Sequence, residues 1–347
     1  MKAKSYAVTS PDAPVDLYEL ERREPGKHDV EIRILYSGIC HSDIHTARGD
    51  WGEIEYPCVP GHEIMGTVTR VGEGVTDFKP GDTVGVGVIV NSCQDCAACK
   101  SDYEQYCENG PTYTYSSKDP IDRTTTQGGY SDLIVTQEKF VVHVPESLDI
   151  SKAAPLLCAG ITMYSPLRHW NAGPGKKVGI IGLGGLGHMG VKYAKAMGAE
   201  VYVITSSPQK AEDAKKFGAD GVIVSSDKDE MKRHSRFFDL LIDTIPVEHD
   251  LYPYLALLNL NSTIVLVGPI NPMPGFHGGD LIDGRKAIAG SGIGSMKEVR
   301  EMLEFSAEHQ ILPEVETVRM QDINEAWKKM QDGAMSHRFV IDVAASF

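Results

Sequence analysis

The stretch that decides the fold is residues 177–187, which read KVGIIGLGGLG. An apolar run, Lys177–Ile181, leads directly into a G-x-G-x-x-G pattern, and a helix-compatible segment, Leu186–Met197, follows it and stops at Gly198. A strand, a glycine-rich turn and a helix in this order form the context in which the pattern binds a dinucleotide. The alternative, a glycine-rich turn without a ligand, does not explain why all three parts are present.

The glycines of this loop have separate physical roles. Gly182 permits the tight turn, Gly184 lets the backbone approach a pyrophosphate at the helix N-terminus, and Gly187 allows helix and strand to pack closely. Together with Gly185 and Leu186, these residues form the predicted pyrophosphate loop.

Strand and helix patterns alternate after the loop. This rhythm predicts an α/β fold, with a doubly wound parallel sheet covered by helices on both faces. The expected elements are strand Glu200–Thr205, helix Gln209–Phe217, strands Gly221–Val224 and Asp239–Thr244, helix Asp250–Leu258 and strand Ser262–Val267.

The rest of the chain has a different sequence pattern. From about residue 4 to residue 144, short β-type runs are separated by Gly, Pro and Asp turns, which predicts an irregular β-rich domain. The β-type runs are Asp29–Leu35, Gly66–Val71 and Thr83–Val90, and the late elements are helices Lys297–His309 and Ile323–Asp332 and strand Arg338–Val343. Because the late elements do not extend the βαβ rhythm, we expect residues 1–155 and 296–347 to form one domain and residues 156–295 the other.

Composition limits the classes of partner. The chain has 347 residues, and its 34 basic and 48 acidic side chains give a net charge of −14, which disfavours nucleic acid. No uncharged apolar run approaches the ~18–20 residues of a membrane span, and the N-terminus lacks the apolar core of a signal peptide. We therefore expect a cytoplasmic protein that binds neither nucleic acid nor membrane.

Four of the seven cysteines are crowded into one short segment. The spacing Cys93-x2-Cys96-x2-Cys99-x7-Cys107 is highly specific for a closed, structural zinc site with four thiolates, in a lobe of about residues 91–110. An iron–sulfur cluster is the alternative, but Glu108 stands where its commoner signature has Pro.

A second metal site is suggested by residue type rather than by spacing. Two thiolates and one imidazole with an open position make a catalytic zinc site, and Cys40 and His62 are candidate ligands. The residues alone do not decide whether Cys58 or Cys158 is the third ligand.

The end of the second predicted strand bears on the choice of cofactor. NAD enzymes usually carry Asp or Glu there, about 20 residues past the glycines, whereas this chain has Ser206, Ser207 and Lys210. Hydroxyls and an ammonium group favour the 2′-phosphate of NADP. A serine cap on the next helix is an alternative that is compatible with this interpretation.

Several of these motifs, in this order, resemble the zinc-containing alcohol dehydrogenases of the medium-chain dehydrogenase/reductase superfamily, and the match covers essentially the whole chain. More narrowly, the chain is similar to the cinnamyl alcohol dehydrogenase group, including its bacterial broad-range aldehyde reductases. The resemblance rests on Gly61-His62-Glu63-x2-Gly66-x5-Gly72-x2-Val75, Cys40-His41-Ser42-Asp43-Ile44-His45, Pro155–Thr162, Gly160–Leu167 and Ser206-Ser207-Pro208-Gln209-Lys210.

The resemblance implies a GroES-like catalytic domain, a Rossmann cofactor domain, two zinc ions per chain, NADP(H) and a homodimer. It implies that Cys158, and not Cys58, joins Cys40 and His62 as a catalytic zinc ligand, with Glu63 beside the metal. The other implied site residues are Asp43 orienting His62, Ser42 and His45 as a proton relay, cofactor contacts at His41, Thr162, Val267, Gly268 and Gly292, and a substrate wall of Trp51 and Tyr113.

The expected activity is the interconversion of primary alcohols and aldehydes. For Trp51 and Tyr113, the interpretation as ordinary core aromatics competes with the substrate wall. Where the plant enzymes usually carry Trp, this chain has Tyr113, which argues against a strict preference for a hydroxycinnamyl ring. Two other functions stay open: an NAD-dependent polyol dehydrogenase on the same fold, and a zinc-lobe protein that senses redox state without turnover.

Overall fold

The structure is a computed structural model that describes residues 1–268, 272–333 and 337–347. The chain forms two compact units, one of residues 1–158 and 294–347 and the other of residues 159–293. These limits lie a few residues from the boundaries expected after residue 155 and before residue 296. No helix in the described parts of the chain is long and apolar enough to cross a membrane.

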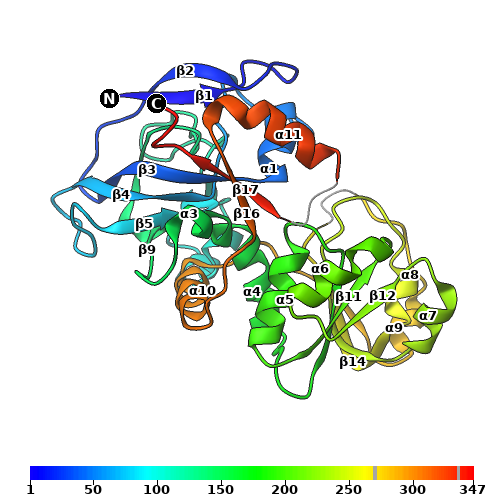
Figure 1. Ribbon diagram of the computed structural model, residues 1–347. Helices are drawn as coiled ribbons and strands as arrows, with labels where there is room; N and C mark the ends of the chain where they lie inside the picture. Colours follow the sequence, from blue (N-terminus) through cyan, green and yellow to red (C-terminus); the bar gives the residue numbers. More distant parts are fainter. Residues whose placement is uncertain (269–271, 334–336) are drawn as a thin grey trace. The chain divides into compact units, whose positions relative to one another are not determined.

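The unit of residues 159–293 contains a six-stranded parallel sheet in the order β12-β11-β10-β13-β14-β15. Figure 1 labels three of these strands, β11, β12 and β14. Strand β10 lies in the middle, and its buried Ile180 pairs with Val203 on one side and with Ile242 on the other. The strands are β10 (Lys177–Ile181), β11 (Glu200–Thr205), β12 (Gly221–Val224), β13 (Phe238–Asp243), β14 (Leu258–Leu266) and β15 (Ala287–Gly290). This order is that of a Rossmann fold, so the predicted α/β class is confirmed.

Helix α4 precedes the first strand of this unit, and helices α5 to α9 each follow a strand, as in a βαβ chain. Helix α5 begins at the glycine loop and packs on β10 and β11, because its buried side includes Met189, Val191 and Ala194. The helices are α4 (Ala159–His169), α5 (Gly187–Ala196), α6 (Ala211–Lys216), α7 (Lys228–Arg233), α8 (Tyr252–Leu255) and α9 (Gly278–Ile282).

Two expected elements differ in extent. The helix expected at Asp250–Leu258 is only the short α8, because Leu258 already pairs with Phe238 as the first residue of β14. The helix expected at Gln209–Phe217 begins as a 3-10 turn, Pro208–Lys210, before α6. The last strand, β15, has no counterpart in the sequence analysis, because Ile288 is the one residue of its sequence AIAG that favours a strand.

The other unit is β-rich, as its short runs predicted. Its main sheet follows the order β16-β17-β3-β4-β5-β9, and β8 also pairs with β3. The strands are β1 (Lys2–Ala7), β2 (Asp16–Glu21), β3 (Asp29–Ile39), β4 (Ile64–Val71), β5 (Thr83–Val86), β6 (Ile89–Asn91), β7 (Thr112–Tyr113), β8 (Leu133–Gln137), β9 (Val141–His143), β16 (Val315–Val318) and β17 (Arg338–Asp342). The run expected as one strand, Thr83–Val90, is divided between β5 and β6, because these pair with different neighbours.

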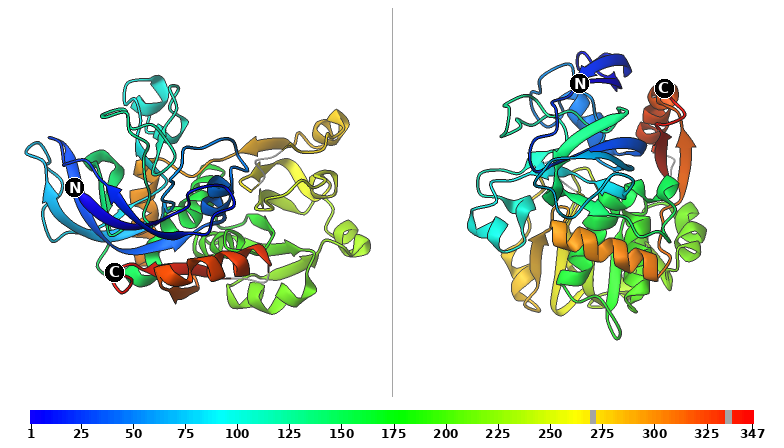
Figure 2. Two further views of the ribbon diagram at one scale, coloured as in Figure 1. Left: turned by 90° about the horizontal axis from the view of Figure 1, so that it is seen from above. Right: turned by 90° about the vertical axis from the view of Figure 1, so that its left-hand side faces the viewer.

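The C-terminal segments return to this unit, as expected. Helix α10 starts with a capping box, in which Ser295 and Glu298 bond to each other's backbone N–H groups. Both ends of the chain lie here (Figure 2), and the rings of Tyr6 and Phe347 are 6.0 Å apart. The helices are α1 (His41–Arg48), α2 (Ala97–Lys100), α3 (Ile150–Ala153), α10 (Met296–Glu308) and α11 (Ile323–Gln331).

Candidate metal centres and cofactor loop

Two groups of side chains in the β-rich unit have the composition of metal sites. One is Cys93, Cys96, Cys99 and Cys107, and the other is Cys40, His62, Glu63 and Cys158. Within each group, the possible ligand atoms all lie within 4.8 Å of one another. The second group contains Cys158 and not Cys58, which is the choice that spacing alone left open.

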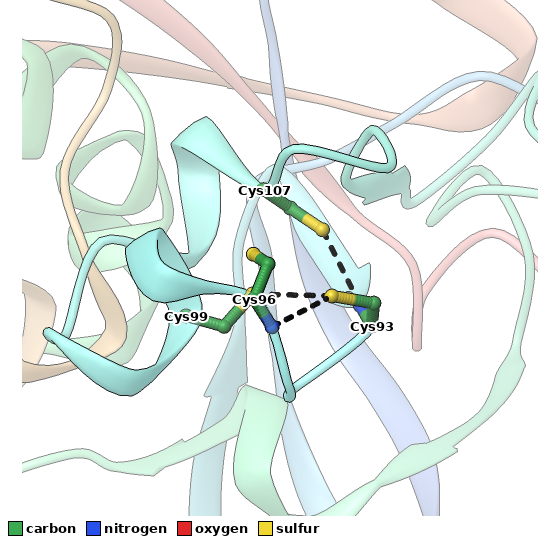
Figure 3. A group of neighbouring side chains, drawn as sticks. All are labelled: Cys93, Cys96, Cys99 and Cys107. Atoms are coloured by element: carbon green, nitrogen blue, oxygen red, sulfur yellow. Dashed lines mark hydrogen bonds between the residues drawn. The ribbon is translucent and has the colours of Figure 1, made fainter.

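The four cysteines come from one loop between β6 and β7, and their side chains converge (Figure 3). Backbone N–H groups point at the sulfur atoms: Cys96 N lies 3.4 Å from Cys93 Sγ, and Cys93 N lies 3.4 Å from Cys107 Sγ. Hydrogen bonds from the backbone at Asp95 and Cys96 lower the pKa of Cys93 to about 6, whereas burial raises the pKa of Cys99 to about 12. Four thiols held by N–H donors in one loop fit a tetrahedral zinc ion.

The second group is assembled from distant parts of the chain. Cys40 follows β3 and precedes α1, His62 and Glu63 precede β4, and Cys158 ends the 3-10 turn Ala154–Leu157. All four residues are buried, with at most 8% of any of them exposed. A hydrogen bond with Cys158 lowers the pKa of Cys40, and the same contact raises the pKa of Cys158. The donor set fits a zinc ion with two thiolate ligands and one imidazole.

Asp43 fixes the orientation of His62. Its Oδ1 atom lies 3.0 Å from His62 Nδ1, which leaves Nε2 of the ring for a metal. Although burial acts to lower it, the pKa of His62 is raised well above its usual value by the carboxylate of Asp43. Asp43 therefore has the orienting position that the resemblance implied.

Glu63 has a partner that the sequence analysis missed. Arg338 of β17 donates to Glu63 Oε1, and both side chains are almost fully buried. Among the residues that the structure describes, none bonds to the buried Glu63 Oε2 atom, and burial raises the pKa of Glu63 to about 7. The available signal was an arginine at the start of a strand whose next three residues are apolar, since a buried arginine needs a nearby acid.

Ser42 and His45, the two residues expected to form a proton relay, lie on α1, which begins directly after Cys40. Ser42 Oγ is 3.6 Å from Cys40 Sγ. His45 Nδ1 lies 2.8 Å from Asp50 Oδ2, and the His45 ring stacks on Trp51 with centroids 5.2 Å apart. Asp50, also absent from the sequence analysis, thus orients the His45 ring.

The two substrate-wall candidates are not core aromatics. Trp51 is 42% exposed beside His45, and Tyr113 on β7 is 48% exposed. His41, expected to contact the cofactor, lies one position after Cys40, and its Nε2 atom is 3.3 Å from the Met330 carbonyl oxygen.

The glycine loop has the geometry that its sequence requires. Gly182 has φ 89°, and a Cβ on Gly187 would lie 2.1 Å from the Gly182 carbonyl oxygen. A Cβ on Gly184 would meet no atom within 4 Å, so its backbone is open on that side. Gly185 lies within the loop, and Leu186 is the N-cap residue of α5.

The segment after β11 reaches back to this loop. Lys210 Nζ donates to the Leu183 carbonyl oxygen over 2.9 Å, so its ammonium group lies at the glycine loop. Ser206 is exposed, and Ser207 is half-buried before the 3-10 turn. The remaining expected cofactor residues lie in the same unit: Thr162 on α4, Val267 and Gly268 just after β14, and Gly292 just after β15.

Comparisons with known proteins agree with this geometry. Residues 26–146 match the family model "Alcohol dehydrogenase GroES-like domain", and residues 185–308 match "Zinc-binding dehydrogenase". The chain is 48% identical to aldehyde reductase YahK of Escherichia coli over 99% of this chain and 98% of that one.

Two solved structures are similar along the whole chain. A cinnamyl alcohol dehydrogenase from Sorghum bicolor superposes with a TM-score of 0.97 at 44% identity, covering 100% of this chain and 99% of that one. The cinnamyl alcohol dehydrogenase from Helicobacter pylori, complexed with NADP(H), gives a TM-score of 0.93 at 43% identity with full coverage of both chains.

Proposed function

The chain belongs to the zinc-containing alcohol dehydrogenases of the medium-chain dehydrogenase/reductase superfamily, in the cinnamyl alcohol dehydrogenase-like group, and we propose that it is an NADP(H)-dependent reductase of a broad range of aldehydes, aromatic ones included. The observation that carries this proposal is the buried group of Cys40, His62 and Cys158, with Glu63 beside it.

These three side chains would hold the catalytic zinc. When bound, zinc supplies a Lewis acid that stabilises the negative charge developing on the aldehyde oxygen during hydride transfer. Asp43 keeps the His62 ring in the orientation that leaves Nε2 free. Arg338 holds Glu63 at the edge of the group and balances part of the charge of the thiolates.

Proton transfer is assigned to side chains of α1. Ser42 would donate a hydrogen bond to the substrate oxygen, because its hydroxyl lies beside the ligand Cys40. His45 would carry the proton onward to solvent, and the contacts with Asp50 and Trp51 hold its ring in place.

The cofactor would lie on the glycine loop, with its pyrophosphate at the N-terminus of α5. Ser206, Ser207 and Lys210 would bind the 2′-phosphate, since the Lys210 ammonium group lies at the loop and no carboxylate stands at residues 205–210 to repel a phosphate. His41, Thr162, Val267, Gly268 and Gly292 complete the proposed cofactor contacts.

We also assign the chain a homodimeric state. Strand β15 ends the sheet order, and Ile282, 81% exposed, and Leu260, 61% exposed, lie on neighbouring segments. An edge strand beside exposed apolar side chains favours pairing with a second copy. The two thiol-rich groups require a reducing compartment, which supports a cytoplasmic location.

A substrate and cofactor panel tests the function. Purified enzyme with NADPH should reduce aliphatic, benzylic and cinnamyl aldehydes, and a polyol such as mannitol should be a poor substrate in reverse. NADPH should exceed NADH by at least about tenfold in kcat/KM, since one charge-assisted contact contributes about 1.5–3 kcal/mol.

A pair of variants tests the cofactor assignment. Ser206→Asp should erase or reverse the preference, whereas Ser235→Asp, an exposed serine elsewhere in the same unit, should leave it unchanged. Equal use of both cofactors by the unmodified enzyme would refute the assignment, and polyol oxidation without aldehyde reduction would refute the proposed function.

A further inference from the structure

The carboxylate of Asp43 is fully buried, and within the described parts of the chain it is joined by four hydrogen bonds. Oδ1 accepts from Gly61 N at 3.0 Å and pairs with His62 Nδ1 at 3.0 Å. Oδ2 accepts from Cys40 N at 2.9 Å and from Tyr130 Oη at 3.2 Å. Three of these donors belong to the proposed metal ligands or to their neighbour in sequence. The fourth, Tyr130, comes from a distant segment that the mechanism does not use.

Tyr130 is joined to the His62 segment by its backbone as well as by its hydroxyl group. Residues 128–130 bond to residues 59–61 through Gly128 N to Val59 O at 2.7 Å, Gly129 N to Gly61 O at 2.9 Å and Tyr130 N to Pro60 O at 2.9 Å. The Tyr130 ring lies against Gly61, where an added Cβ would be 2.7 Å from its Cδ1 atom. The phenol therefore approaches Asp43 on a backbone that is itself fixed to the metal-site loop.

The second contact of the Tyr130 hydroxyl group determines which partner receives its proton. Trp327 Nε1 lies 3.5 Å from Tyr130 Oη, and an indole N–H can only donate. The hydroxyl oxygen accepts this bond, so its one proton is available for Asp43. Trp327 thus donates to Tyr130, and Tyr130 donates to Asp43 Oδ2. The other oxygen of Asp43 accepts from His62. Trp327 is carried by α11, so the C-terminal helix supports the metal site through this sequence of contacts.

We propose that Tyr130 is a positioning residue of the catalytic metal site, which holds the Asp43 carboxylate in the one orientation that fixes the His62 ring, and that Trp327 supports it from α11. This inference rests on the proposed assignment of His62 as a metal ligand. The geometry distinguishes this role from simple filling of the core. Phenylalanine would fill nearly the same volume, but it would leave one lone-pair site of a buried carboxylate and the indole N–H of Trp327 without partners.

The test measures how fast zinc dissociates from the folded enzyme. A chelator that changes colour when it binds zinc reports the zinc released. The unmodified enzyme should release two zinc ions in two phases, and the phase missing from Cys158→Ser belongs to the catalytic site. Tyr130→Phe should accelerate that phase roughly tenfold and leave the phase of the four-cysteine site unchanged. Trp327→Phe should accelerate the same phase by less, since it acts one step further out.

Tyr56→Phe is the matched control. The Tyr56 hydroxyl group donates to the Ala47 carbonyl oxygen at 3.0 Å, so this variant loses a phenol hydrogen bond in the same unit without touching Asp43. Both release phases should equal those of the unmodified enzyme. If Tyr130→Phe and Tyr56→Phe accelerate release equally, or if both zinc phases of Tyr130→Phe accelerate together, the role is general stability and the proposal is wrong.

A second readout does not depend on zinc. In the enzyme as purified, the indole N–H proton resonance of Trp327, identified by its loss in Trp327→Phe, should shift upfield in Tyr130→Phe because its acceptor is gone. An unshifted resonance would overturn the proposal even if Tyr130→Phe lost zinc during purification. An unmodified enzyme with a single zinc ion would instead contradict the proposed function, so the two failures are distinguishable.

Discussion

The two candidate metal groups of the β-rich unit are built in opposite ways. The four-cysteine group comes from one loop, its Cys93 and Cys96 are half-exposed, and backbone N–H groups of the same loop donate to the sulfur atoms. The second group joins residues as distant as Cys40 and Cys158, is buried, and is held by side chains such as Asp43 and Arg338. The structure of the first group therefore depends on its own loop and its metal. The residues of the second group are brought together by the fold of the whole unit. Loss of a ligand should therefore have different consequences at the two sites.

The largest effect is expected when one cysteine ligand is replaced at each site. Cys158→Ser should lower kcat/KM by more than about 10⁴-fold, or about 5.5 kcal/mol, while the protein stays folded and still binds NADPH. Cys96→Ser should instead destabilise the lobe, because a structural zinc site contributes folding energy directly. Activity, melting temperature and elemental zinc are the measurements, with about two zinc ions per chain expected in the unmodified enzyme. An unchanged melting temperature in Cys96→Ser would contradict the structural role of the four-cysteine group.

Ser42→Ala tests the reaction chemistry beside the buried group. The loss of a hydrogen bond to the reacting oxygen should lower kcat/KM by about 10²–10⁴-fold with both zinc ions retained. Steady-state kinetics together with zinc analysis measures this, and Ser101→Ala at the C-cap of α2 is a control at the other metal group. Near-normal turnover in Ser42→Ala would remove the hydroxyl from the mechanism.

Removal of zinc should reveal that the thiols of the four-cysteine lobe differ in reactivity. The lowered pKa of Cys93, about 6, makes it a thiolate once the pH rises through 6, whereas the pKa of Cys99, about 12, keeps that group a thiol at neutral pH. At about pH 7.5 we expect iodoacetamide to label Cys93 at least about tenfold faster than Cys99 in the chelated protein, as measured by peptide mass spectrometry.

The pH dependence of this labelling has a defined sign. Labelling of Cys93 should increase from about pH 5 to about pH 7 and then level off, because only the thiolate reacts. Buried Cys58, whose pKa burial raises to about 12, provides a slow reference in the same sample. Equal labelling of Cys93 and Cys99 would show that the N–H donors do not prepare the lobe for its metal.

The smallest effect is expected at the outer end of the relay. His45→Gln should slow alcohol oxidation several-fold, because the proton loses its step to solvent, and added imidazole should restore part of the rate. Asp50→Asn, which removes the partner of the His45 ring, should have a smaller effect in the same direction. If imidazole accelerates the unmodified enzyme as much as His45→Gln, the relay assignment is wrong.

Much of the cofactor-binding unit could be predicted because its signals are local. The strand Lys177–Ile181 and the glycine pattern after it are contiguous, so the parallel α/β fold followed from their order. The four-cysteine group was predictable for the same reason. The extent of α8 and the existence of β15 were not, because Leu258 is taken into β14 by its pairing with Phe238, and the small residues of β15 form a strand only beside β14.

The fold class, the dinucleotide loop and the composition of the first metal group could be predicted from the order and spacing of residues within continuous segments of the chain. The family resemblance already indicated Cys158 rather than Cys58 as the companion of His62, but tertiary contacts alone placed Arg338 against Glu63 and directed Tyr130 and Trp327 toward Asp43. The physical reason is that a buried charge must find its partners wherever the fold supplies them. Those partners come from strands and helices whose sequence separation carries no information about their distance in space.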